Sequence, residues 1–136
     1  MKILVDTDVL LDVALDRRAF VKPAMDLLDR LERREATGFI AWHTAANFYY
    51  LVRPRRGKAD ARSMLLDLMA FVAIAPTTTE SLLQAGRLEL RDFEDAMQVA
   101  AGLACGAEVI ATRNVRDYGG APIQATHPAD LLKVLS

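Results

Sequence analysis

Short apolar runs alternate along the chain with longer segments whose apolar residues recur every three or four positions. The runs have the length and β-branched content of buried strands, and the periodic segments have the spacing of helices that bury one face. The pattern predicts strands over residues 2–5, 39–42, 71–75, 108–111 and 122–125, and helices over residues 22–31, 43–52, 59–70, 93–105 and 128–134. A further helix, capped by a hydroxyl within residues 77–79, is predicted to run to about residue 87. Such alternation favours a parallel sheet covered on both faces. The predicted fold class is α/β, with a parallel sheet of about four to five strands flanked by helices.

Length and composition limit how the chain can be organised. With 136 residues, of which 52% are hydrophobic, it can bury one sizeable core, so a single domain over residues 1–136 is predicted. No apolar run approaches the roughly 20 residues of a membrane-spanning helix, and a cytoplasmic location is predicted. The lone cysteine, Cys105, cannot form an internal disulfide and is expected to be buried and inert.

Charged residues are balanced in number but segregated along the chain. There are 17 Lys and Arg against 18 Asp and Glu, so no overall positive field indicates a nucleic-acid binder. The basic run RPRRGK over residues 53–58 could contact an RNA backbone or form a solvated loop. Acidic residues gather in two groups, which are Asp6, Asp8 and Asp12, and Asp92, Glu94 and Asp95.

The first acidic group lies where α/β proteins form active sites. Asp6 directly follows the strand over residues 2–5, and the segment 112–117 follows the strand over residues 108–111. The carboxyl ends of parallel strands meet at one edge of the sheet, where functional groups converge. A structural role after a buried strand would usually favour an apolar or turn residue, so Asp6 is predicted to be functional.

The second acidic group borders a predicted apolar helix surface. Asp92 and Asp95 are three positions apart and share one face in the first turn of the helix over residues 93–105. Carboxylates massed at a partly dry edge repel each other, and a divalent cation removes that repulsion. Mg²⁺ or Mn²⁺ suits oxygen ligands, and no His or Cys pair has the spacing of a zinc site. The predicted chemistry is activation of a water for attack on a phosphodiester.

Several of these acids also have structural interpretations. Asp92 could simply cap the helix that follows it, and Asp117 could form a turn before two glycines. Asp8 could end the first strand. Solvated or helix-end charges are expected at Asp12, Asp16 and Glu94.

The order of these segments resembles the PIN-domain family, which includes the toxins of VapBC toxin–antitoxin systems. The sequence ILVDTDVLLD over residues 3–12 is like the family's hydrophobic strand followed by D-T-N or D-T-D. In RDFEDAMQVAAGLACGAEVIATRNVRDY over residues 91–118, the family's D-A corresponds to Asp95 and Ala96. Its T-x-N/D followed by an acid corresponds to Thr112, Asn114 and Asp117. The resemblance covers nearly the whole chain.

The resemblance implies a PIN fold and a Mg²⁺- or Mn²⁺-dependent endoribonuclease, the toxin of a toxin–antitoxin pair. It implies that Asp6 and Asp95 bind the metal and that Asp92 and Asp117 complete the catalytic acids. Residues expected around the metal or the RNA substrate are Thr7, Asn47, Thr112, Arg113 and Asn114, with Arg113 as a phosphate contact. A homodimer and a small antitoxin partner are also implied.

Two alternatives remain open. Asn47 stands where many family members have a glutamate, and its amide can accept a hydrogen bond but brings no charge, which would suit a non-catalytic PIN module that binds RNA or protein. Asp6, Thr7 and Asp8 also resemble the start of a haloacid-dehalogenase-type phosphohydrolase with an aspartate nucleophile. That reading lacks a later lysine, because no lysine lies between Lys58 and Lys133.

Overall fold

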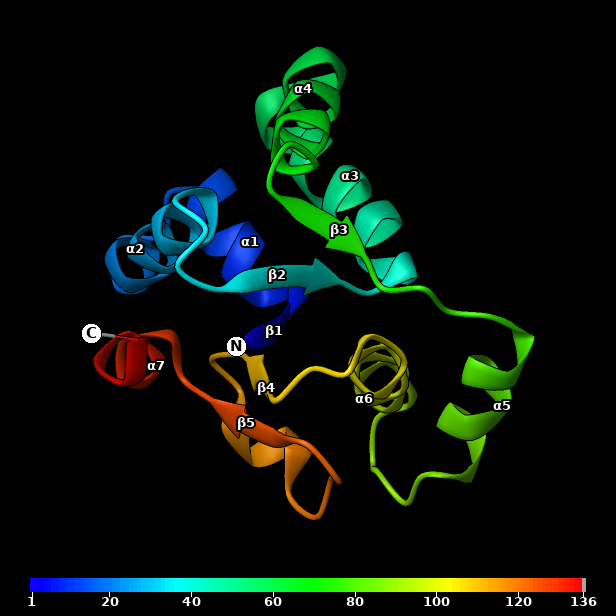
Figure 1. Cartoon of the computed structure of the whole chain (residues 1–136). Helices are drawn as coiled ribbons and strands as arrows, with labels where there is room; N and C mark the ends of the chain where they lie inside the picture. Colours follow the sequence, from blue (N-terminus) through cyan, green and yellow to red (C-terminus); the bar gives the residue numbers. More distant parts are fainter. Residues whose placement is uncertain (136) are drawn as a thin grey trace.

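The computed structural model describes residues 1–135 and contains, within them, one five-stranded parallel sheet in the order β3-β2-β1-β4-β5 (Figure 1). The elements are β1 (Lys2–Val5), α1 (Thr7–Ala14), α2 (Val21–Glu32), β2 (Thr37–Ile40), α3 (Trp42–Arg56), α4 (Lys58–Leu68), β3 (Val72–Ile74), α5 (Thr79–Arg87), α6 (Phe93–Cys105), β4 (Val109–Ala111), the 3-10 turn η1 (Val115–Tyr118), β5 (Gln124–Thr126) and α7 (Pro128–Leu135). Ser136, which the predicted domain includes, lies outside the described residues.

The central strand β1 is apolar on both faces, which places it between two helical layers. Ile3 and Val5 pack into one core with residues of α1, α2, α3 and α7, whereas Leu4 packs into a second core with Val99 of α6 and Ile110 of β4. Figure 1 shows α6 and α5 on the opposite side of the sheet from α1 and α2. The prediction of an α/β fold with helices on both faces is confirmed.

The sequence pattern missed α1, which follows β1 without a loop. Asp6 has extended backbone angles, and its side chain accepts a hydrogen bond from the Thr7 backbone at 2.7 Å, so it caps this helix. Val9 and Leu10 are buried on the sheet side of α1. A polar triplet after an apolar strand therefore marks here a direct transition from strand to helix.

The second strand lies two residues earlier than predicted. It was expected over residues 39–42, but β2 spans Thr37–Ile40 and Trp42 begins α3. The extended Ala41 is the helix cap, and its carbonyl accepts from the Thr44 backbone at 3.1 Å. Gly38 lies inside β2 because a Cβ there would come within 2.8 Å of Leu31 in α2.

The helix predicted over residues 43–52 does not end before Pro54 as expected. Proline lacks the N–H that would bond to the preceding turn, yet α3 continues to Arg56. The helix ends at Gly57, whose φ of 87° is a conformation that only glycine adopts readily. RPRRGK is therefore mostly the end of a helix and not a loop.

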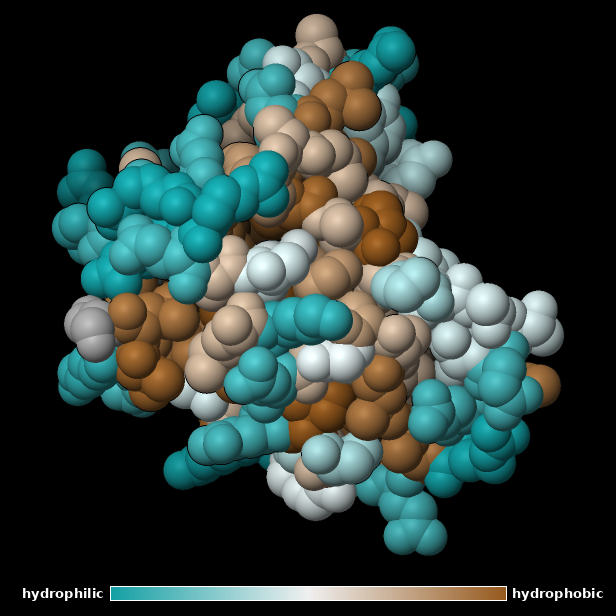
Figure 2. Space-filling model, in the orientation of Figure 1, coloured by the Kyte–Doolittle hydropathy of each residue, from teal (hydrophilic) through white to brown (hydrophobic). Residues whose placement is uncertain are grey.

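The described surface is mixed in character. In Figure 2, hydrophilic residues cover α2, and hydrophobic residues are exposed over α7, where Val134 is 63% exposed. Cys105 is buried, as predicted. Among residues 1–135, no helix is both long enough and apolar enough to cross a membrane.

Candidate active site

The candidate site lies where the strand order reverses. The chain proceeds from β1 through β2 to β3 and then crosses back to place β4 and β5 on the other side of β1. Beyond the last pairs of β1 and β4, the Asp6 backbone donates to the Ala111 carbonyl at 2.9 Å. Crevices at the carboxyl ends of the strands at such a switch point are the usual binding sites of open α/β sheets.

The Asp6 carboxylate is held from three directions. The side chain is 6% exposed, and its Oδ1 accepts from the Thr7 backbone. Its Oδ2 accepts from the hydroxyls of Thr112 at 2.9 Å and Tyr118 at 2.8 Å. The role of Tyr118 was not predicted, although a buried tyrosine hydroxyl needs a partner and would have been a usable signal.

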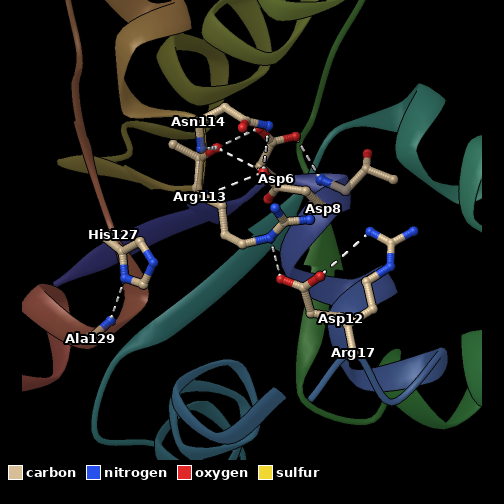
Figure 3. A network of polar contacts seen from close by, with 10 residues as sticks. Asp6, Asp8, Asp12, Arg17, Arg113, Asn114, His127 and Ala129 are labelled. Atoms are coloured by element: carbon tan, nitrogen blue, oxygen red, sulfur yellow. Dashed lines mark hydrogen bonds and ion pairs between the residues drawn. The ribbon is translucent and has the colours of Figure 1, made fainter. Parts of the chain in front are cut away.

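Asp8 also belongs to the site, contrary to its interpretation as a strand end. Its Oδ2 accepts from the Asn114 side chain at 3.0 Å and from the Arg113 backbone at 3.2 Å, and it lies 3.2 Å from the Thr112 hydroxyl. Figure 3 shows Asp6, Asp8 and Asn114 facing one another. The buried Oδ1 of Asp8 has no hydrogen-bond partner in the described part of the chain.

A pocket of about 270 Å³, here called the acidic pocket, opens beside these residues. Its polar lining comes from four segments and consists of Asp6, Thr7, Asp8, Asn47, Asp92, Glu94, Asp95, Asn114 and Asp117. The structure therefore brings together all four acids that the sequence placed at the site. Thr112 and Arg113 lie behind Asp8 and do not line the pocket.

Two acids of the lining come from the start of α6. Asp92 caps the helix, accepting from the backbones of Glu94 at 2.7 Å and Asp95 at 3.4 Å. Its predicted capping role is confirmed, and it also lines the pocket. Asp95, in the first turn of the helix, is partly exposed. The geometry of the first turn of α6 thus fixes the side from which these two carboxylates face the acidic pocket.

A buried polar network lies beneath the pocket and joins α1, α3 and α6. The hydroxyls of Thr7 and Thr44 are 3.0 Å apart, and the fully buried Gln98 amide donates to Thr44 at 3.1 Å and to Thr7 at 3.4 Å. No sequence pattern indicates this network, because its members are 37 to 91 positions apart. It holds the helix that carries Asp95 against the helix that follows Asp6.

The expectation that Asp12 is a solvated charge is wrong, although it does lie near the end of α1. Asp12 is 1% exposed and pairs with the guanidinium groups of Arg113 and, at 3.5 Å, Arg17 (Figure 3). Arg113 also stacks over the Phe20 ring, 4.1 Å from its centroid. The side chain of Arg113 is therefore committed to Asp12 and Phe20 and is not positioned as the predicted phosphate contact.

The basic run over residues 53–58 is also partly committed to internal contacts. The Arg53 guanidinium lies over the Tyr50 ring at 4.8 Å from its centroid. Arg56 pairs with Asp60 at 3.4 Å and reaches the Ala14 carbonyl. None of its residues lines the acidic pocket, so the run does not surround the site directly.

Burial and mutual repulsion raise the pKa values of the pocket acids. Burial, followed by the charge of Asp6, raises the pKa of Asp8 from 3.8 to about 7. Burial, followed by the charges of Asp92 and Asp6, raises the pKa of Asp95 from 3.8 to about 7. Burial also raises the pKa of Asp6 itself, and that of Tyr118, which stays protonated and donates to Asp6. Among residues 1–135 no Lys or Arg lines the acidic pocket, and the charge of Arg113 behind Asp8 offsets only part of the rise in its pKa.

The donor set of the acidic pocket suits Mg²⁺ or Mn²⁺ by type. Carboxylate and amide oxygens are the ligands that these ions prefer, and Asp8 Oδ1 is a buried oxygen without a partner in the described chain. Within residues 1–135, no three Asp, Glu, His or Cys side chains form a ready-made cage for an ion. The form that fits is an ion held by one or two carboxylates and by water, as is usual for Mg²⁺.

In the absence of metal, the stability of the protein is expected to fall as the pH rises from about 4 to about 7. Over this interval the folded state holds protons on Asp8 and Asp95 that the unfolded chain has released, because both pKa values are about 7 when folded. The stability linked to these protons is complete at low pH and is lost as the pH rises through the folded pKa values. Urea unfolding in EDTA between pH 5 and pH 8 measures the slope, and Mn²⁺ should reverse it above about pH 7. Rising stability over this interval in EDTA would contradict the expectation.

Comparison with known proteins identifies the family. The sequence profile of the PIN domain matches residues 2–116. The chain belongs to the PIN-domain family. The predicted resemblance is thereby confirmed for most of the chain. The matched range includes all of the pocket acids except Asp117, which lies just beyond it in η1. No curated protein matches the chain.

Solved structures of VapC toxins share the PIN fold seen here. VapBC2 from Rickettsia felis, bound to a DNA fragment from its promoter, has a TM-score of 0.70 at 15% identity, covering 93% of this chain and 98% of the other. Mycobacterium tuberculosis VapC20, a toxin that cleaves the sarcin-ricin loop, has a TM-score of 0.67 at 18% identity, covering 88% and 95%. DNA-bound VapBC from Salmonella typhimurium has a TM-score of 0.68 at 13% identity, covering 94% and 98%. At these identities the likeness establishes the fold.

Proposed function

We propose that this PIN-domain protein is a metal-dependent endoribonuclease that hydrolyses RNA phosphodiester bonds. The observation that carries the proposal is the convergence of Asp6, Asp95 and Asp117 from three distant segments on one pocket, where the pKa values of Asp6 and Asp95 are raised. Strongly shifted pKa values in a cleft are typical of functional sites. The fold shared with a toxin that cleaves the sarcin-ricin loop supports the same activity.

In this proposal Asp6 and Asp95 hold Mg²⁺ or Mn²⁺, and Asp92 and Asp117 extend the negative lining. The bound ion would lower the pKa of a water and stabilise charge on the phosphate under attack. Thr112 and Tyr118 fix the Asp6 carboxylate by donating to Oδ2. Asn47 and Asn114 offer neutral amides at the pocket wall, which can orient water or substrate without adding charge.

The other readings are less well supported by the geometry. Both oxygens of Asp6 accept hydrogen bonds and the side chain is 6% exposed, which does not favour a covalent nucleophile. A non-catalytic module that binds RNA or protein is the second candidate, favoured by the uncharged Asn47 in the pocket lining. It differs from the first by predicting binding without hydrolysis.

The partners follow from the same proposal. The structural neighbours from Rickettsia felis and Salmonella typhimurium are VapBC assemblies bound to DNA, which supports a toxin role with a small antitoxin partner. A homodimer and a cytoplasmic location remain predictions for this chain. Sedimentation of the purified protein tests whether it is a homodimer.

The proposal predicts that the purified protein cuts a labelled RNA of mixed sequence with Mn²⁺ or Mg²⁺ and not with EDTA. Because water is the proposed nucleophile, the products should carry linear phosphates and no 2′,3′-cyclic phosphate. Asp6→Asn should abolish cutting, whereas Asp67→Asn, which removes an exposed acid of α4, should not.

Cyclic phosphate products, or equal cutting by Asp6→Asn, would contradict the proposal and point to a contaminating nuclease. RNA binding without any cutting in either metal would favour the non-catalytic module.

A further inference from the structure

A second hollow of about 640 Å³ lies beside the acidic pocket, and we call it the arginine groove. Its lining includes Arg91, Asp92, Asp95, Arg116 and Asp117. The three aspartates also line the acidic pocket, so the two hollows share a wall. A chain-like substrate that enters the pocket can therefore extend into the groove without leaving the protein surface.

Each of the two arginines directly precedes an aspartate of the wall that the groove shares with the acidic pocket. Arg91 directly precedes Asp92 in the loop between α5 and α6, and Arg116 directly precedes Asp117 in η1. Both side chains belong to exposed residues. Neither forms an ion pair with any residue between 1 and 135, although four carboxylates, those of Glu89, Asp92, Asp95 and Asp117, line the same hollow. Their guanidinium groups are therefore available to an anion from outside.

This availability separates them from the arginines that the sequence favoured. The guanidinium of Arg113 is paired with Asp12, and that of Arg56 with Asp60. Arg53 is stacked on Tyr50. In each of those cases an external phosphate would have to displace an existing contact, whereas no such displacement is required at Arg91 or Arg116.

The charge of the acidic pocket creates a need for such cations. RNA carries a negative charge at every nucleotide, and the pocket is lined by six acids, which are Asp6, Asp8, Asp92, Glu94, Asp95 and Asp117. One divalent ion offsets only part of this repulsion, and charges within the Debye length of about 8 Å remain poorly screened. Cations next to the pocket can hold the neighbouring phosphates in place, and the planar fork of arginine suits phosphate oxygens.

We propose that the arginine groove binds backbone phosphates of single-stranded RNA next to the bond that is cut, through Arg91 and Arg116. The proposal rests on the proposed ribonuclease function and adds the binding site for the flanking strand. Because the contacts are to phosphates, the groove supplies affinity and register and does not read the base sequence.

The test measures the affinity of a fluorescent single-stranded RNA at several salt concentrations. Arg91→Gln and Arg116→Gln, singly and together, are made in the non-cutting Asp6→Asn protein with Mg²⁺ present. The matched control is Arg55→Gln with Arg62→Gln, which removes two exposed arginines outside the groove. Each groove substitution should weaken binding about fivefold and lower the slope of log affinity against log salt by about 0.7. Arg91→Lys should keep most of the slope, because it keeps the charge.

Kinetics of the cutting protein give an independent measurement. The double groove variant should raise KM about tenfold and leave kcat within about twofold, since the arginines do not contact the reacting atoms. Thermal unfolding should be unchanged, because both side chains are exposed and unpaired.

Three results would overturn the inference. If RNA is bound and cut but the groove variants behave like the Arg55 and Arg62 control, the groove proposal is wrong and the ribonuclease stands. If the unsubstituted protein neither binds nor cuts RNA, both proposals are wrong. Equal losses in the groove and control variants would indicate a diffuse charge effect and would also overturn the assignment.

Discussion

Asp95→Asn is expected to abolish metal-dependent RNA cleavage while making the metal-free protein more stable at neutral pH. The cleavage rate should fall by at least about a hundredfold, since an amide replaces a proposed metal-binding carboxylate. Removing a carboxyl whose pKa is raised to about 7 also removes repulsion from Asp92 and Asp6. Because Asp95 is partly exposed, solvent screening limits the stabilisation to about 1 kcal/mol at pH 8. Cleavage assays and urea unfolding in EDTA measure the two effects.

The opposite signs of these effects distinguish a functional acid from a structural one. Replacing a carboxylate that stabilises the fold would lower both the activity and the stability of the protein. Asp67→Asn on α4 serves as the control and should change neither. In the Asp95→Asn protein, Mn²⁺ should also give a smaller increase in the unfolding temperature, because one ligand is missing. Undiminished cleavage, or a clear loss of stability, would contradict the assignment of Asp95.

Asp12→Ala is expected to lower the free energy of unfolding by about 3 kcal/mol. Asp12 is 1% exposed, and its loss would leave the Arg113 guanidinium, whose side chain is 20% exposed, without its carboxylate. Breaking one partner of a buried pair is strongly destabilising because the remaining charge is uncompensated. The Arg113 backbone donates to Asp8, so cleavage should also decline as this loop loses its position. Urea unfolding of the variant measures the first effect.

The control for this prediction is Arg17→Ala, which removes the outer contact to Asp12. The Arg17 side chain is 39% exposed and lies 3.5 Å from the carboxylate, so its loss should cost less than about 1 kcal/mol. A double-mutant cycle between Asp12 and Arg113 isolates their interaction. A coupling energy near zero would show that the pair does not hold the loop.

The sheet and the main acids could be predicted because their signals are local. The buried strand before Asp6 and the small-residue helix after Asp95 each lie within one short segment. Parallel strand order then places their ends at one edge of the sheet. By contrast, the pairing of Asp12 with Arg113 spans 101 positions, and that of Tyr118 with Asp6 spans 112. No spacing rule links residues so far apart, so these contacts required the structure.

Local sequence signals also led to wrong element boundaries at two places, the end of β1 and the end of α3. Asp6 ends β1 and caps α1, so the polar triplet that follows the strand was interpreted only as its end. Pro54 disfavours a helix through its missing N–H, yet α3 continues to Arg56 and is ended by Gly57, whose φ is positive. The capping of the next helix by Asp6 decided where α1 begins, and the positive φ of Gly57 decided where α3 ends.

The switch point between β1 and β4 also determines when the acidic pocket can first form. Its first acid lies on residue 6 and its last on residue 117, and the strand that joins them is β4. A ribosome-bound chain that has not yet released residues 109–118 lacks the Thr112 and Tyr118 donors that fix Asp6. Such contacts between distant segments form late in folding. The proposed RNA-cutting centre therefore cannot be complete until residues 109–118 have left the ribosome.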